Sequence, residues 1–142
     1  MNTGKLLNKD GFLKRLITLC LRSGLTDFPK DVRDQHVLLK SAMIGLDDSQ
    51  TFTEKEINEF LKNWIDQVCQ IKGIDQVTLR RHLIDAGYLT RTKDGSTYQV
   101  STSGPHRQYF DESIEKLDIP GEIDKARQEI ERRKREFLQK KK

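Results

Sequence analysis

Residues Thr53-Glu54-Lys55-Glu56 constrain the local fold more tightly than any other part of this chain. They form a capping box, in which the Thr53 hydroxyl accepts a hydrogen bond from a free backbone N–H and Glu56 reaches back to the cap. Apolar residues then recur at helical spacing. They are Ile57, Phe60, Leu61, Trp64, Ile65 and Val68. The pattern predicts an amphipathic helix that begins at Thr53 and ends before a turn over residues 70–74.

A second helix and a hairpin are predicted directly after this turn. Asp75 is the expected cap of the second helix and Gly87 its stop. Residues 88–92 and 97–100 have β-strand character, and the Asp94-Gly95 pair between them is typical of a hairpin turn. Residues 51–52 are expected to form a short strand that pairs with the hairpin. The fold class that follows is mainly α with a small β-hairpin, arranged as a winged helix-turn-helix with extra N- and C-terminal helices.

Two further helices are predicted before the helix that begins at Thr53. The first runs over residues 11–23, with Asp10 as its N-cap and Gly24 as its stop. It is apolar around most of its circumference, so it either joins the main core or packs against another subunit. For the second helix, Asp27-Phe28-Pro29 is the expected start signal, with Asp27 as cap. Its predicted apolar face carries Val32, His36, Leu39 and Met43, and it ends by Gly45.

The pattern divides the chain into four parts. Residues 1–27 hold the apolar N-terminal helix, and residues 28–100 hold the winged-helix-like domain. Residues 101–120 are predicted to be a linker, because Gly104-Pro105 interrupts a polar stretch. Residues 121–142 form a basic C-terminal helix. The apolar stripe of this last part carries Ile119, Ile123, Ala126, Ile130 and Phe137, next to the basic run at residues 132–135.

The positive charge of the chain is unevenly distributed. The formal net charge is +4, but residues 28–100 hold 10 basic and 11 acidic side chains, so the central domain is not basic overall. Within it, residues 70–100 carry +2 and residues 28–69 carry −3. A protein that binds phosphates needs its positive charge on one face, whatever the total. This distribution permits nucleic-acid binding without requiring it.

Composition favours a cytoplasmic protein of about one domain with appended segments. The first residues lack the apolar stretch of a secretory signal, and no apolar run is long enough to cross a membrane. Cys20 and Cys69 both lie in apolar helical patterns, which favours two buried, reduced thiols.

Residues 28–100 resemble the bacterial family known as domain of unknown function 2087. The resemblance lies in Phe28-Pro29-Lys30, in residues 51–58 and 78–85, and in the glycine and tyrosine pattern of residues 87–98. It implies a winged-helix-like module, a kind sometimes found beside helix-turn-helix regulators. It supplies no activity and no catalytic residues, and the two terminal helices lie outside the common domain.

In a DNA-binding protein of this fold, the helix after Asp75 enters the major groove, where arginine pairs with guanine and glutamine with adenine. The hairpin contacts the backbone or the minor groove. The candidate DNA-binding residues are Lys72, Gln76, Thr78, Arg80, Arg81, Arg91 and Lys93. An alternative is that Arg80 and Arg81 pair with Asp85, Asp75 or acidic residues of the preceding helices, and that Lys93 beside Asp94 belongs to an ordinary hairpin.

No pattern in the chain indicates a metal centre, a cofactor or an enzyme. His36, His82 and His106 are scattered, with no ligand spacing between them and no nearby cysteine. His36, on an apolar stripe, is expected to be a packed side chain. No glycine-rich phosphate loop follows a strand.

Two functions stay open on the sequence. The first is a transcriptional regulator that binds double-stranded DNA as a homodimer built from the terminal helices. The second is a protein-interaction or oligomerisation module that has the winged shape but binds no nucleic acid. The first is the leading hypothesis, and the charge of the central domain and the apolar first helix support the second.

Overall fold

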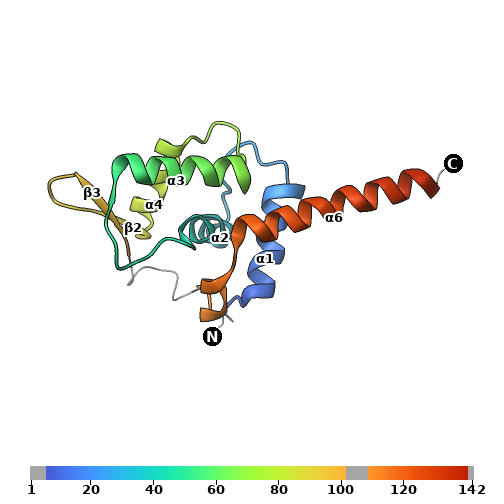
Figure 1. The fold of residues 1–142 in the computed structure, drawn as a ribbon, viewed down its shortest axis with the longest axis horizontal. Helices are drawn as coiled ribbons and strands as arrows, with labels where there is room; N and C mark the ends of the chain where they lie inside the picture. Colours follow the sequence, from blue (N-terminus) through green and yellow to red (C-terminus); the bar gives the residue numbers. More distant parts are fainter. Residues whose placement is uncertain (1–5, 102–108, 141–142) are drawn as a thin grey trace.

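One cluster of buried side chains connects helices from both ends of the chain in the computed structural model, which describes residues 6–101 and 109–140. The α-helices are α1 (Lys9–Ile17), α2 (Val32–Met43), α3 (Glu54–Gln67), α4 (Gln76–Asp85) and α6 (Ile119–Lys140). A π-helix, η1 (Thr18–Arg22), continues α1, and a 3₁₀ helix, η2 (Glu112–Lys116), precedes α6. Figure 1 shows α2 at the centre of this arrangement, with α3 on one side of it and α1 and α6 on others.

A small antiparallel sheet completes the fold. Its strands are β1 (Phe52–Thr53), β2 (Leu89–Arg91) and β3 (Thr97–Val100), in the spatial order β1-β3-β2. Phe52 pairs with Tyr98, and Arg91 pairs with the same residue from the other side of β3. The hairpin turn contains Gly95 at φ 75°, a conformation that favours glycine. The prediction of a mainly α fold with a small hairpin is confirmed, as is the pairing of a short strand before α3 with that hairpin.

The helix boundaries at the centre of the chain follow their capping residues. The Thr53 hydroxyl accepts a hydrogen bond from the Glu56 N–H at 3.1 Å, and the Glu56 carboxylate accepts one from the Thr53 N–H at 2.9 Å. Asp75 caps α4 by accepting from the Thr78 N–H at 2.8 Å. Both start signals are therefore confirmed, because each depends only on residues within one helical turn.

The predicted cap of the first helix was wrong. Helix α1 begins at Lys9, and its cap is Asn8, whose side-chain oxygen accepts from the Gly11 N–H at 2.9 Å. Asp10 therefore lies inside the first turn, where its negative charge still favours the N-terminus of the helix. The predicted stop holds: the helical segment ends before Gly24, which has φ 60°.

The predicted start of the second helix was also wrong. Helix α2 begins at Val32, and Asp31 caps it by accepting from the Asp34 N–H at 3.1 Å. Asp27 instead accepts from the Phe28 N–H, four residues before the cap. Val32 is 56% exposed, so it does not belong to the buried face on which the spacing placed it.

Residues 109–117 pack against the core, although they lie in the segment expected to be a linker. Phe110 and Ile114 are buried, and the Phe110 ring meets Phe12 of α1 edge-on, with 5.3 Å between ring centroids. Leu7 bonds through its backbone to Tyr109 at 2.8 Å and to Asp111 at 3.0 Å. A single core thus includes side chains from all four parts into which the sequence divides the chain. Gly104-Pro105, the basis of the linker prediction, lies outside the described residues.

Polar contacts join the helices around this core. Arg15 of α1 forms a bidentate ion pair with Asp34 of α2, in which two guanidinium nitrogens each donate to one carboxylate oxygen at 2.6 Å. The Trp64 indole N–H donates to the Ser41 hydroxyl at 3.0 Å. His36 contacts the Tyr88 hydroxyl through Nδ1 at 2.7 Å, and burial lowers the pKa of its imidazole. His36 is therefore a packed side chain, as the sequence indicated.

The outer half of α6 extends beyond the rest of the fold. Ile119 and Ile123 are buried, whereas all residues from 131 to 140 are exposed, with Phe137 at 60% and Leu138 at 63%. Figure 1 shows this half of the helix pointing away from the hairpin, which lies at the opposite end of the molecule. In the parts of the chain that the structure describes, no helix combines the length and apolar character needed to cross a membrane.

Candidate nucleic-acid interface

Helix α4 is anchored on one side and open on the other. Leu79 and Leu83 are buried against the core, and the helix contacts α3 and β2. Arg81 and Asp85 are exposed on its outer side. The helix-turn-helix formed by α3 and α4 therefore presents one face of α4 to solvent beside the hairpin.

Arg80 points into the protein. Its side chain is only 14% exposed, and its guanidinium group donates a hydrogen bond to Asn58 and lies 3.5 Å from the Glu54 carboxylate. The same group lies over the Tyr98 ring, 5.6 Å from its centroid. These contacts join α4 to α3 and β3, as the alternative of internal pairing expects. Arg80 therefore stabilises the packing of these elements, and its guanidinium group is not free to contact a ligand.

Arg81, the next residue, is exposed. Its side chain makes no hydrogen bond or ion pair with any part of the chain that the structure describes, and neither does the side chain of Asp85. The internal pairing that the sequence allowed for both arginines is thus found for Arg80 and not for Arg81. A free guanidinium group on the open face of α4 is able to contact a phosphate or a guanine edge.

The N-terminus of α4 is already occupied by a carboxylate. Asp75 accepts from the Thr78 N–H, and hydrogen bonds from Thr78 lower the pKa of Asp75. This negative charge occupies the position at which a phosphate binds a helix N-terminus. Gln76 and Thr78 are half-buried, and Lys72 is exposed in the preceding turn.

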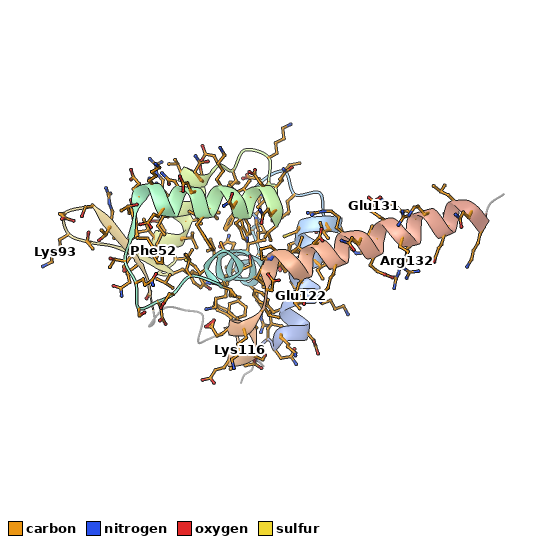
Figure 2. All side chains as sticks on the ribbon, viewed as in Figure 1. Phe52, Lys93, Lys116, Glu122, Glu131 and Arg132 are labelled. Carbon is orange, nitrogen blue, oxygen red and sulfur yellow. The ribbon has the colours of Figure 1, made fainter. Side chains whose placement is uncertain are left out.

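The hairpin carries two basic residues in different settings. Arg91 lies over the Tyr98 ring at 5.8 Å and donates to the Gly95 carbonyl at 3.3 Å. Lys93 is exposed at the tip, and Figure 2 shows its side chain extending away from the ribbon. Both residues are on the protruding part of the fold, but only Lys93 extends outward without a contact among the described residues.

Asp94 places a persistent negative charge beside Lys93. Its carboxylate accepts from the Ser96 N–H at 3.0 Å, the Ser96 hydroxyl at 2.7 Å and the Thr92 hydroxyl at 2.8 Å. These bonds, first of all those from Ser96, lower the pKa of Asp94 to about 2. The tip therefore carries one positive and one negative charge at neutral pH, which reduces its net attraction to phosphate.

Tyr98 organises the base of the hairpin, a role that the sequence pattern did not indicate. The guanidinium groups of Arg80 and Arg91 both lie over its buried ring, and its hydroxyl donates to Glu54 at 3.2 Å. The cluster fixes the direction of the hairpin relative to α3 and α4. Only strand alternation could have indicated that Tyr98 points inward, because its partners come from distant parts of the chain.

One flank of α4 is covered by the segment before α2. The Phe28 ring stacks on His82 at 4.2 Å between centroids, with an interplanar angle of 10°. The open surface of α4 is thus narrower than its helical pattern indicates. The candidate interface that remains consists of Arg81, Lys72 and Lys93, with Gln76 and Thr78 partly accessible.

No group of three or more His, Cys, Asp or Glu side chains suited to hold a metal ion occurs among residues 6–101 and 109–140. His82 is stacked and His36 is packed, while His106 lies outside these ranges.

Comparison with known proteins places the chain in a family without giving it an activity. No curated protein and no solved structure matches it. A family model matches residues 24–100, which is more than half of the chain, and its description is "uncharacterized protein conserved in bacteria (DUF2087)". The chain therefore belongs to the DUF2087 family.

Proposed function

We propose that residues 24–100 are a winged-helix module that binds double-stranded DNA, and that the protein is a transcriptional regulator of the cytoplasm. The order α2-β1-α3-α4-β2-β3, with β1 paired to β3, supports this assignment. Winged helices use the second helix of the helix-turn-helix in the major groove and the hairpin beside it. The observation that carries the proposal is the free guanidinium group of Arg81 on the open face of α4.

In this proposal, the contacts of the candidate residues support different roles for them. Arg81 is the base-edge or phosphate ligand, and Lys72 and Lys93 are backbone ligands that position the duplex. Arg80 and Arg91 hold the hairpin through Tyr98, so they shape the interface without being its principal ligands. With a net charge of −1 over residues 28–100, binding depends on this local face rather than on a general positive field.

Removal of the exposed cations should weaken DNA binding without changing the fold. Fluorescence anisotropy of a labelled mixed-sequence duplex, at a low salt concentration of about 50 mM, measures the affinity. We expect Arg81→Ala to lower it about tenfold, since one good arginine contact contributes roughly 1–3 kcal/mol. Lys93→Ala should have a smaller effect that shrinks as salt is added.

Lys62 provides a matched control, because it is an exposed lysine on α3. Lys62→Ala should leave the affinity unchanged. If the wild-type protein binds no duplex at low salt, or if Lys62→Ala weakens binding as much as Arg81→Ala, the proposal is wrong.

The exposed end of α6 supports a homodimer built from the terminal helices. Phe137 and Leu138 lie mostly in solvent, and a second copy would cover them and place two α4 helices on one duplex. Light scattering of the wild-type protein and of a Phe137→Ser/Leu138→Ser variant measures this association. We expect the wild-type protein to have the mass of a dimer and the variant to have the mass of a monomer. A stable wild-type dimer that binds no DNA would instead favour the second candidate function, a protein-interaction module.

A further inference from the structure

The two cysteines of the chain meet in space although 49 positions separate them. Cys20 lies in the π-helix η1, and Cys69 follows the C-cap residue of α3. Both line a surface cavity of about 440 Å³ whose other walls include Asp66, Gln70 and Arg127. The fold therefore brings two thiols from separate elements to the wall of one surface cavity.

The Cys69 thiol lies near enough to Cys20 to affect its pKa. Both are in the free thiol state, with Cys69 buried and Cys20 partly buried. Burial is the largest cause that raises the pKa of the Cys20 thiol, and hydrogen bonding with Cys69 is the second. The positive charge of Arg127 lowers this pKa. Cys20 thus keeps its proton at neutral pH.

The local backbone at Cys20 is also unusual. The Ser23 N–H bonds to the Thr18 carbonyl at 2.9 Å, which is the i→i+5 pattern of a π-helix. Single π turns are rare and occur frequently at functional sites. The wider turn changes the direction of the side chains that follow Ile17, and Cys20 is one of them.

We infer that Cys20 and Cys69 form a peroxide-sensitive dithiol, a modification site that closes to an intramolecular disulfide. In the first step the Cys69 sulfur, as thiolate, attacks one oxygen of hydrogen peroxide. The O–O bond breaks, Cys69 becomes a sulfenic acid, and the departing hydroxide takes up the proton lost from the thiol to give water. In the second step the Cys20 sulfur attacks the sulfenic sulfur, the S–O bond breaks, and the hydroxyl leaves as water with the Cys20 proton. Peroxide is reduced to two waters and the two thiols lose two electrons.

The disulfide joins η1 to the start of the turn between α3 and α4. It closes a loop of 50 residues, counted from Cys20 through Cys69. A cross-link of this length restricts the unfolded chain strongly. Oxidation should therefore raise the thermal midpoint of unfolding by an amount on the order of 10 °C.

Mass spectrometry of the full chain tests the inference. The reduced protein is treated with hydrogen peroxide, and intact mass is measured without a reducing agent. We expect a loss of about 2 Da, the two hydrogens of the thiols, together with a peptide linking Cys20 to Cys69, both reversed by a phosphine reductant.

Serine variants separate the roles of the two residues. In Cys20→Ser, peroxide should convert Cys69 to a sulfenic acid that dimedone traps, whereas in Cys69→Ser, Cys20 should stay unmodified. If folded wild-type protein keeps both thiols, gains oxygen without losing hydrogens, or forms only disulfides between chains, the inference is overturned. The wild-type peptide map decides the matter even if a variant does not fold.

Discussion

Replacement of Phe110 by alanine should lower the free energy of unfolding by about 3–4 kcal/mol, measured by chemical denaturation. Phe110 is 5% exposed and packs edge-on against Phe12 of α1. Truncation of a buried phenylalanine removes apolar burial and leaves a cavity, and it also removes the ring contact. The prediction matters because Phe110 lies in the stretch that the sequence marks as a linker, where such a change would have little effect.

Phe137 is the matched control for this prediction. It is also a phenylalanine, but it is 60% exposed on the outer half of α6. Phe137→Ala should change the stability of a protomer by no more than about 0.5 kcal/mol. Equal effects of the two substitutions would mean that residues 109–117 do not belong to the core.

Arg80→Ala should lower the free energy of unfolding by about 2 kcal/mol, whereas Arg81→Ala should leave it nearly unchanged. The Arg80 side chain is 14% exposed and bonds Asn58, so its removal leaves a half-buried amide without its partner. The contact with Glu54 adds little, because that carboxylate is 52% exposed and solvent screens it. Thermal and denaturant unfolding of both variants measures the difference.

DNA affinity should depend on the same two variants in the reverse order: Arg81→Ala should weaken binding more than Arg80→Ala. Arg81→Ala should weaken binding directly, because it removes a DNA ligand. Arg80→Ala should weaken binding only because it loosens the hairpin. This second effect should shrink when binding is measured well below the temperature at which the Arg80→Ala variant unfolds. A variant lacking Arg80 that is as stable as the wild type but does not bind DNA would contradict this division of roles between the two arginines.

Local signals explain why much of the fold was predictable. The capping box at Thr53, the cap at Asp75 and the turn at Gly95 each depend on a few neighbouring residues, and all three are found in the structure. Caps were misplaced where several candidates lie close together. Asn8 and Asp10 differ by two residues, and both suit a helix start, so the choice depends on where the preceding chain enters the core.

The candidate site was less predictable, because its decisive contacts are not local. Arg80 and Arg81 are adjacent on a helix and have the same chemistry, and the difference between them arises from Tyr98, Asn58 and Glu54. No spacing rule brings these residues together before the sheet order is known. The packing of Phe110 was missed for a similar reason, since isolated apolar residues in a polar segment have no period that indicates burial.

Chemical-shift mapping tests the proposed DNA interface most directly. An isotopically labelled protein is titrated with a short duplex at low salt, and backbone and arginine side-chain signals are followed. We predict the largest changes at Arg81, Lys72 and the hairpin tip around Lys93, with small changes on α1 and α6. Changes confined to α6, or none at all at a duplex excess, would contradict the proposed interface.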